Sequence, residues 1–367
     1  MKLKKWIACA TAISLIGLGA CSPAADTQAG SISSNQSGTA SDNEYSSLDT
    51  INLAEYKSSA AAMDFIPEGT NLSGTKPDGT KYKIAWCVHD MADESQAHMT
   101  RISRDYAKQY GFELLEFDAQ ADPQKQIDHI NQAITQGCDA VVVSPVDAKS
   151  TSGAMKKAKE AGVVVVNSQM EVTDSDSFDV YCGPNDTQAG QMAASALMEM
   201  LPDGGKVVII EGFPGSAPQI NRDAGFLGVM QKHPEFKILE IQTANWSTAD
   251  AMNVMESYMS KYPEIDVVYS HFDLATLAAI QAAEGTGRAD DIIFLSVDGT
   301  QGALDKIAEG GCFKFTAMQD FSLSTELQYL VALAHLNGQG DSLDKMIYVP
   351  YICIEQDNAG NFEAGWG

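Results

Sequence analysis

The sequence predicts an α/β protein with two doubly wound lobes, each built on a parallel sheet. Two observations support this fold class. From Tyr82 onward, short apolar runs alternate with amphipathic helical stretches, and the alternation occurs in two successive sets. The runs are apolar at every position, as in Val163–Val166, which is typical of parallel strands that helices cover on both faces. The chain of 367 residues is long enough for two such domains.

The first set of alternating elements occupies residues 82–183. Its first helix ends on Gly111, and the side chains of Ile127, Ile130 and Ile134 lie on one face of the second. In chain order we expect strands at 82–88, 112–117, 138–145, 163–169 and 178–183, with helices at 95–111, 123–137 and 147–162.

The second set begins after residue 184 and repeats the same order. Helix 248–262 has apolar side chains at i, i+3 and i+4, and Ser247 with Asp250 forms a plausible capping box before it. The expected strands are 206–212, 236–242, 266–271 and 291–297, with helices between them.

Residues 1–20 predict a secretion signal that is not part of the fold. Three lysines among the first five residues precede an apolar run at 6–20, which is too short for a stable membrane span. The run ends in Leu-Gly-Ala before Cys21, which resembles the lipobox of bacterial lipoproteins and implies lipidation of Cys21. The alternatives are an ordinary signal peptide or an anchor helix. Residues 21–81 would form a lipidated flexible tether and N-terminal extension.

Charge and cysteine usage narrow the class of protein. The chain has 24 Lys and Arg against 49 Asp and Glu, and the resulting net charge of −25 argues against nucleic-acid partners. None of the cysteines after the signal segment stands in a CxxC pair, so we interpret them as small buried side chains and expect no metal and no cofactor. These cysteines are Cys87, Cys138, Cys182, Cys312 and Cys353.

Polar and aromatic side chains follow the predicted strands at their carboxyl ends, where parallel sheets bind ligands. Planar carboxylate, carboxamide and guanidinium groups hydrogen-bond neighbouring hydroxyls, and aromatic rings pack against the C–H faces of sugars. This combination predicts a site for a sugar or sugar-like polyol. The candidate ligand-binding residues are His89, Asp90, Asp93, Gln96 and Gln169 in the first set, and Arg222, Trp246, Phe272, Asp273, Asp298 and Gln319 in the second.

Several of these residues also have a purely structural interpretation. Trp246 is placed to act as a hydrophobic staple before a helix, and Phe272 is apolar enough for the core. We expect Asp273 to be an N-cap, whatever else it does, and Asp298 precedes a Gly-Thr turn signal. His89 is a conceivable catalytic base, but no group to orient it is visible in the sequence.

Four stretches resemble the ribose-type sugar-binding proteins that serve bacterial ABC transporters. The resemblance covers about residues 82–355 and is most specific at 122–147, 185–194, 221–226 and 294–310. It implies a type 1 periplasmic binding protein fold, acting as a monomer, that delivers its ligand to an ABC permease. Arg222, Asp298 and Gln319 match the family's ligand contacts by motif, and Asp93, Trp246 and Phe272 match by position.

The resemblance also implies three hinge crossings, near Gly183, near Gln319–Asp320 and near Val349. The N-terminal lobe would then comprise 82–183 plus 320–348, and the C-terminal lobe 184–319 plus 349–367. The implied location is extracytoplasmic, either lipid-anchored to the outer face of the cell membrane or periplasmic, with contact to the membrane through the lipid anchor only.

The chain departs from the family pattern in its first lobe. Gln169 and Met170 stand where relatives often have an Asp-Arg pair, and Ser95 and Gln96 stand where aromatic rings commonly stack on the sugar. No calcium-loop pattern occurs near 202–206, where a related branch carries one. The departures leave open which sugar or polyol is bound.

Three other functions compete with transport. A ligand sensor for a membrane receptor would use the same pocket with a different partner. A hydrolase using His89 and Asp90 lacks a supporting nucleophile elbow, P-loop or dinucleotide motif. A DNA-binding repressor is excluded because a lipobox occupies the place of a helix-turn-helix and the charge has the wrong sign.

Overall fold

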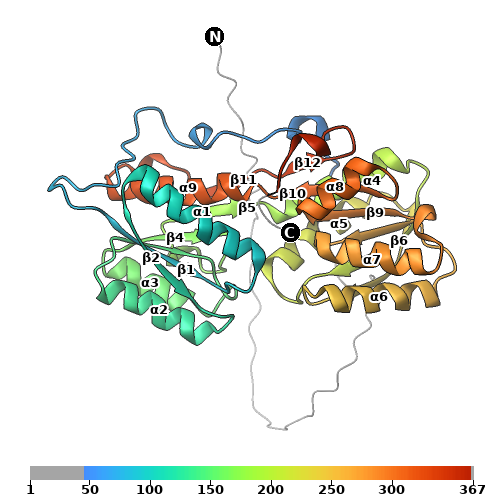
Figure 1. Ribbon diagram of the computed structural model, residues 1–367, viewed down its shortest axis with the longest axis horizontal. Helices are drawn as coiled ribbons and strands as arrows, with labels where there is room; N and C mark the ends of the chain where they lie inside the picture. Colours follow the sequence, from blue (N-terminus) through green and yellow to red (C-terminus); the bar gives the residue numbers. More distant parts are fainter. Residues whose placement is uncertain (1–44, 365–367) are drawn as a thin grey trace, which may run out of the picture. The chain divides into compact units, whose positions relative to one another are not determined.

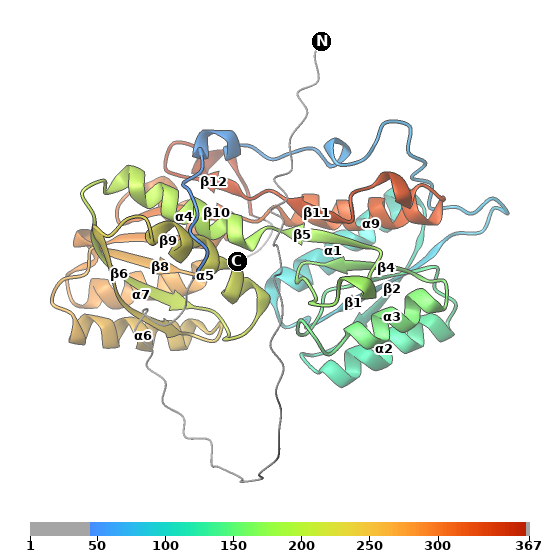
Figure 2. The same ribbon diagram turned by 180° about the vertical axis from the view of Figure 1, so that it is seen from behind.

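The computed structural model describes residues 45–364, which form two six-stranded sheets with helices on both faces (Figures 1 and 2). The signal peptide, the lipidation site Cys21 and the tether up to residue 44 lie outside the described residues. The fold predicted from the sequence, two doubly wound α/β lobes, is confirmed.

The first lobe has the strand order β11-β5-β4-β3-β1-β2, and every neighbouring pair is parallel. Its elements are β1 (Lys83–Val88), α1 (Glu94–Tyr110), β2 (Glu113–Asp118), α2 (Pro123–Thr135), β3 (Ala140–Val143), α3 (Ser152–Glu160), β4 (Val164–Ser168), β5 (Val180–Pro184), α9 (Phe321–Leu336) and β11 (Met346–Val349).

Strand β1 shows why the strands of this lobe are apolar at every position. Ile84 and Trp86 pack in one cluster with residues of α1 and α9, whereas Ala85 and Cys87 pack in another with residues of α2 and α3. Successive side chains of a strand point to opposite faces, so a sheet covered on both sides buries all of them.

The second lobe has the strand order β12-β10-β9-β8-β6-β7, with β12 antiparallel to β10 and the other pairs parallel. Its elements are α4 (Asp186–Met200), β6 (Gly205–Glu211), α5 (Ala217–Met230), β7 (Phe236–Thr243), α6 (Thr248–Lys261), β8 (Val267–Ser270), α7 (Asp273–Gly285), β9 (Ile293–Asp298), α8 (Gln301–Glu309), β10 (Phe313–Met318) and β12 (Ile352–Ile354).

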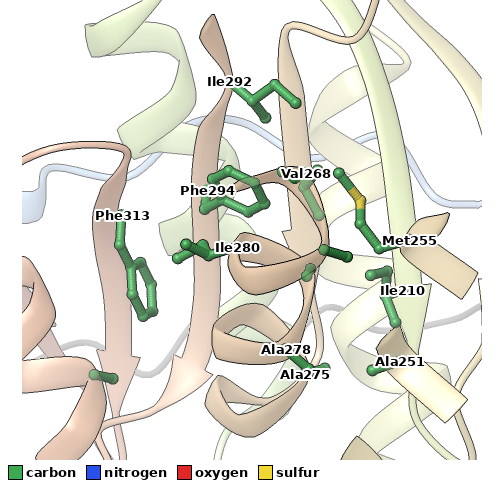
Figure 3. Packing of buried hydrophobic residues seen from close by; sticks show 14 of the residues in the cluster. Ile210, Ala251, Met255, Val268, Ala275, Ala278, Ile280, Ile292, Phe294 and Phe313 are labelled. Carbon is green, nitrogen blue, oxygen red and sulfur yellow. The ribbon is translucent and has the colours of Figure 1, made fainter. Parts of the chain in front are cut away.

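One of the two cores of this lobe lies between the sheet and helices α6, α7 and α8. Ile210, Val268 and Phe294 of the sheet belong to the same buried cluster as Met255 of α6 and Ile280 of α7 (Figure 3). Fully burying a side chain of this size contributes about 1.5–3 kcal/mol relative to leaving it exposed.

The chain passes between the two sheets three times: after β5, after β10 and after β11. A small pocket adjoins all three passages. Its volume of about 10 Å³ leaves room for about one water molecule. It is lined by Gln169, Pro184, Gln319, Asp320, Ser324, Val349, Pro350 and Tyr351.

Helix α3 begins at Ser152, five residues later than the sequence suggested. Asp147 explains the difference, because its Oδ1 accepts hydrogen bonds of 2.8 Å from the backbone N–H groups of Lys149 and Ser150. A side chain that bonds the following backbone holds a turn and competes with helix formation.

The predicted buried cysteines are present as free thiols, four of them buried and Cys312 partly exposed. Burial raises the pKa of the Cys138 thiol to about 11, which makes it unreactive at neutral pH. No helix within residues 45–364 combines the length and the apolar character needed to cross a membrane.

Helices α4 and α5 approach each other closely because glycines face each other where they meet. A Cβ atom added at Gly225 would lie 2.1 Å from the carbonyl oxygen of Thr187, and one added at Gly190 would lie 2.2 Å from that of Arg222. No side chain fits at either position without moving a helix, so the two glycines set the separation of α4 and α5.

We expect Gly225→Ala to lower the free energy of unfolding by about 1–3 kcal/mol, because the added methyl group forces the two helices apart. Gly153→Ala on the exposed face of α3 is the matched control. Its Cβ meets no atom within 4 Å, so this change should stabilise the protein by up to about 1 kcal/mol. Urea unfolding measures both, and equal effects of the two substitutions would contradict the close-packing argument.

Candidate ligand-binding site

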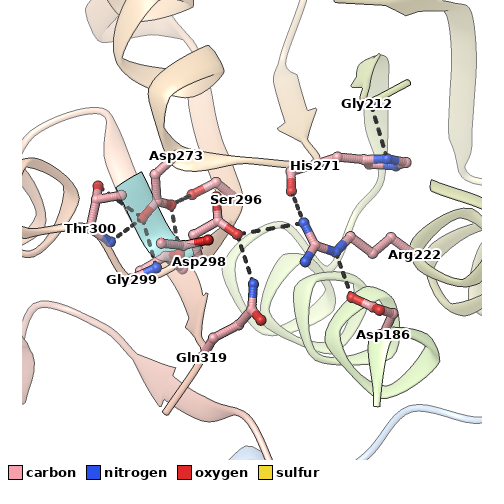
Figure 4. Close-up of polar contacts among 12 residues, drawn as sticks. Asp186, Gly212, Arg222, His271, Asp273, Ser296, Asp298, Gly299, Thr300 and Gln319 are labelled. Carbon is pink, nitrogen blue, oxygen red and sulfur yellow. Dashed lines mark hydrogen bonds and ion pairs between the residues drawn. The ribbon is translucent and has the colours of Figure 1, made fainter. Parts of the chain in front are cut away.

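The carboxyl ends of the second-lobe strands bring Arg222, Trp246, Phe272, Asp298 and Gln319 into one group. The guanidinium of Arg222, on α5, lies 3.6 Å from the carboxylate of Asp298, which ends β9. Gln319 follows β10 and donates from Nε2 to Asp298 Oδ1 at 3.0 Å (Figure 4). The group therefore joins residues that are far apart in the sequence.

Arg222 is only 4% exposed and is fixed from several sides. Its Nε donates to Asp186 Oδ1 at 2.8 Å, and its Nη1 donates to the backbone carbonyl of His271. The hydroxyl of Tyr351 donates to the same oxygen of Asp186 at 2.7 Å. Because Asp186 neutralises one edge of the guanidinium, the other edge is held toward Asp298 without freedom to rotate.

Asp298 adopts a backbone conformation that side chains rarely take, with φ of +132°, and Gly299 follows at +81°. Burial raises the pKa of the Asp298 carboxyl; Arg222 opposes this shift, and the nearby carboxylate of Asp273 adds to it. Arg222 therefore offsets only part of the cost that burial imposes on the charged form of Asp298.

Trp246 provides an aromatic surface beside this polar group. Its ring lies 5.7 Å from the guanidinium carbon of Arg222 and 5.3 Å from the ring of Phe272, which it meets edge-on. A Cβ atom at Gly212 would lie 2.1 Å from the indole, so only glycine lets the ring rest on the backbone there. Trp246 is 37% exposed, which leaves part of the indole available for contact.

Three of the proposed site residues have a left-handed backbone. Gln169, Trp246 and Asp298 have positive φ, and among residues 45–364 only six residues other than glycine do so. Such conformations cost about 1–3 kcal/mol each and persist where the surrounding structure enforces them, commonly at binding and catalytic sites.

In the first lobe, His89 lies between a carboxylate and a hydroxyl. Its Nε2 is 3.6 Å from Asp93 Oδ2, and its Nδ1 is 3.2 Å from the hydroxyl oxygen of Ser144, which follows β3. Asp93 is also the N-cap of α1 and accepts a hydrogen bond of 2.8 Å from the backbone N–H of Ser95. Ser144 was not identified from the sequence.

Asp93, His89 and Ser144 contact one another in the order of a hydrolase triad. Their exposure to solvent is the reverse of that in a triad. Ser144 is 1% exposed, whereas the side chain of Asp93 is 44% exposed. A serine nucleophile has to reach its substrate, and the carboxylate that orients the histidine is normally buried. The arrangement suits hydrogen bonding to a ligand better than nucleophilic attack.

The other three candidates of the first lobe have partners within the protein. Asp90 accepts a 2.9 Å hydrogen bond from the backbone N–H of Ala92 and shapes the turn after β1. Gln96 is buried, with its Nε2 3.8 Å from the sulfur of Met99. Gln169 donates from Nε2 to Ser324 at 3.1 Å and lines the small pocket at the three passages.

Asp273 has a structural role that differs from the expected N-cap. Phe272 holds the N-cap position of α7, and Asp273 is the first helical residue with its side chain 0% exposed. Its carboxylate accepts hydrogen bonds from the backbone and hydroxyl of Thr300, the backbone of Gly299 and two further hydroxyls (Figure 4). With these acceptor sites filled, it ties α7 to β9, β10 and the turn before α8.

Sequence reasoning also missed a partly buried group of titratable side chains next to the site. Glu211 at the end of β6 and Asp223 on α5 face each other, and His271 Nε2 lies 3.2 Å from Asp223 Oδ1. Burial raises the pKa of Glu211 to about 8 and that of Asp223 to about 6, and burial lowers the pKa of His271 to about 3. The histidine is therefore neutral near pH 7, and Glu211 keeps a proton.

Among residues 45–364, no group of three or more His, Cys, Asp or Glu side chains is arranged to hold a metal ion. The second-lobe group instead offers a fixed cation, a carboxylate acceptor, a carboxamide and an aromatic face. These are the groups that hold a polyhydroxylated molecule.

A family model described as a periplasmic binding protein domain matches residues 84–340. The chain belongs to the periplasmic binding protein family. This periplasmic binding protein is 31% identical over 317 residues to the xylitol-binding protein of Mycolicibacterium smegmatis. The alignment covers 84% of this chain and 88% of the relative.

Two solved structures support the same assignment. An ABC transporter solute-binding protein from Bacillus halodurans with bound myo-inositol has a TM-score of 0.72 and 26% identity, and covers 78% of this chain and 98% of its own. The myo-inositol-binding protein of Caulobacter has a TM-score of 0.70 and 25% identity. The match covers 78% of this chain and 98% of the Caulobacter chain.

The relatives named above are binding proteins by name. This periplasmic binding protein therefore falls among the sugar- and polyol-binding solute-binding proteins of ABC transporters, a class that acts outside the cytoplasm.

The raised pKa of Glu211 predicts a pH dependence of stability. An ordinary glutamate in the unfolded chain releases its proton near pH 4.5, whereas the folded protein holds it up to about pH 8. The stabilisation from this proton is complete below pH 4.5 and is lost as the pH rises through 8. We expect the contribution of Glu211 to the free energy of unfolding to fall as the pH rises from about 4.5 to about 8, and Glu211→Gln to remove that fall.

Urea unfolding at several pH values measures this difference. The control is Glu256→Gln at an exposed position of α6, which should leave the pH profile unchanged. A Glu211→Gln profile parallel to that of the unsubstituted protein would show that Glu211 titrates normally.

Proposed function

We propose that this protein is an extracytoplasmic solute-binding lipoprotein that captures a sugar or sugar-like polyol between its lobes and delivers it to an ABC import permease. The observation that carries the proposal is the fixed set of Arg222, Asp298 and Gln319 beside the ring of Trp246. A charged donor, a carboxyl group and a carboxamide bind neighbouring hydroxyls, while the indole covers a C–H face.

The three passages between the sheets would form the hinge of the clamp. The proposed crossings are near Gly183, Gln319–Asp320 and Val349, and the lobes would comprise 82–183 plus 320–348 and 184–319 plus 349–367. His89, Asp90, Asp93, Gln96 and Gln169 would face the ligand from the first lobe. Asp273 is left out of the proposed contacts because its carboxylate is saturated by the protein.

A polyol is favoured over a hexose as the ligand. In the first lobe, polar side chains stand where the family commonly places stacking rings, so aromatic contact is confined to Trp246 and Phe272 in the second lobe. A linear or cyclic polyol has many hydroxyls and needs only one apolar contact surface. The similarity to a xylitol-binding protein and to structures holding myo-inositol supports this ligand class.

A thermal-shift screen against pentitols, inositols, pentoses and hexoses tests the proposal. A ligand that binds only the folded state raises Tm by mass action, so at least one compound should raise it. We expect Asp298→Asn to weaken binding of that compound by about 1.5–3 kcal/mol, or roughly 10- to 150-fold, because a carboxyl group that hydrogen-bonds the ligand is lost.

Isothermal titration calorimetry measures the affinities. Asp290→Asn, at an exposed position of the same lobe, is the control and should bind as the unsubstituted protein does. If no sugar or polyol raises Tm, the ligand class is wrong; if Asp298→Asn binds normally, the site is elsewhere.

The proposed lipid anchor is tested separately. Cys21→Ala removes the only thiol that the lipobox can present for lipidation, so the variant should move from the membrane fraction to the soluble fraction. Cys312→Ala, which changes a partly exposed thiol of the folded part, should stay with the membrane. A Cys21→Ala protein still found in the membrane fraction would refute the anchor.

A further inference from the structure

Residues 45–81, named the strap here, precede the part of the chain matched by the family model and contact both lobes. The strap begins on the second lobe. The backbone N–H of Leu48 donates to the carbonyl of Gly228 on α5, and that of Ile51 donates to the hydroxyl of Ser195 on α4, both at 2.9 Å. Leu53 is 2% exposed and packs in the core that α4 and α5 cover.

The rest of the strap lies on the first lobe. Ala62 and Ile66 are buried in the same cluster as residues of α9. Asn71 donates from its backbone N–H to the side chain of Gln339, just beyond α9. Farther along, the N–H of Gly74 donates to the carbonyl of Tyr110 at 2.9 Å. In both views of the fold the strap, drawn in blue, runs past β12 and α9 (Figures 1 and 2).

The change from one lobe to the other occurs within two residues. Lys57 Nζ lies 2.7 Å from Glu355 and 2.9 Å from Asp357, both beyond β12 in the second lobe. Ser59 donates from its hydroxyl to Asp320, the N-cap of α9 in the first lobe. Only Ser58 lies between them, and two residues span at most about 7 Å, so the strap has little slack at this point.

Both attachments lie next to the passages between the sheets. Asp320 follows β10, caps α9 through a 2.9 Å hydrogen bond from the backbone N–H of Leu323, and lines the small pocket at the three passages. Glu355 directly follows β12, beyond the third passage. A rotation of one lobe against the other changes the separation of Asp320 and Glu355, and the strap joins these residues through Lys57 and Ser59.

We propose that the strap is a fourth connection between the lobes, one that resists their closure and lowers the affinity for the ligand. The conformation in which both attachments are made leaves Trp246 37% exposed and the Asp93 side chain 44% exposed. Closure that covers these residues has to stretch the strap or detach Lys57 or Ser59. By linkage, the free energy lost in doing so is subtracted from that of ligand binding.

An insertion that adds slack without removing a contact tests this proposal in the full-length chain. Gly-Ser-Gly inserted between Ser58 and Ser59 adds about 10 Å of reach. The matched control is the same insertion between Asp78 and Gly79, an exposed turn of the strap that lies wholly on the first lobe. Calorimetry with the strongest compound of the screen should give a Kd about five-fold lower for the first insertion and an unchanged Kd for the control.

Lys57→Met provides a second variant in case the insertion disturbs folding. It removes the second-lobe attachment next to the passage and should also lower Kd. Lys232→Met is its control, because Lys232 pairs with Asp49 at a distance from the passage. An unchanged or higher Kd for both the insertion and Lys57→Met would overturn the proposal.

The affinity measurement rests on the proposed function, because it needs a compound that binds. A measurement without ligand tests the strap independently. Small-angle X-ray scattering should show a broader range of molecular dimensions for the insertion between Ser58 and Ser59 than for the unsubstituted protein or the control insertion. Identical curves would overturn the proposal even if no ligand is found. Failure of the compound screen alone would refute the ligand class and leave the strap to be judged by scattering.

Discussion

The site depends on one buried ion pair, between Arg222 and Asp186. Removing two charges from water is costly, and the cost is offset only where the geometry is good and further hydrogen bonds satisfy both groups. Here Tyr351 donates to Asp186, and the carbonyl of His271 accepts from Arg222. The close approach of α4 and α5 at Gly190 and Gly225 brings Arg222 Nε within 2.8 Å of Asp186 Oδ1. The ion pair, in turn, fixes the guanidinium beside Asp298.

Rigidity at this site has a functional consequence. Asp298 and Trp246 are held in left-handed backbone conformations, and the packing and hydrogen bonds of the second lobe hold them there. Side chains ordered before the ligand arrives lose less entropy on binding. In the proposed function the second lobe would therefore present a prepared surface, whereas Asp93 of the first lobe is half-exposed. The proposed clamp would bind its ligand first on the second lobe and then close the first lobe over it.

Much of the architecture followed from local patterns. Runs such as Val163–Val166 indicated strands buried on both faces, and polar residues after them indicated the ligand-binding edge. Two differences have identifiable causes. Asp147 bonds the following backbone N–H groups and delays α3, and Asp273 bonds to distant strands rather than capping α7. Ser144, Asp186 and Tyr351 were missed as members of the site because no spacing in the sequence links them to His89 or Arg222.

The sequence by itself therefore determined the two α/β lobes and the residue types at the strand ends, because these depend on periodicity and on neighbours along the chain. The family was indicated by the resemblance of four stretches to known sugar-binding proteins. Only the tertiary structure decided which of those residues act together. Arg222 meets Asp186 across a helix pair, Gln319 meets Asp298 across two strands, and the strap reaches both lobes. Such contacts join residues that are far apart along the chain, and their distances are set by packing.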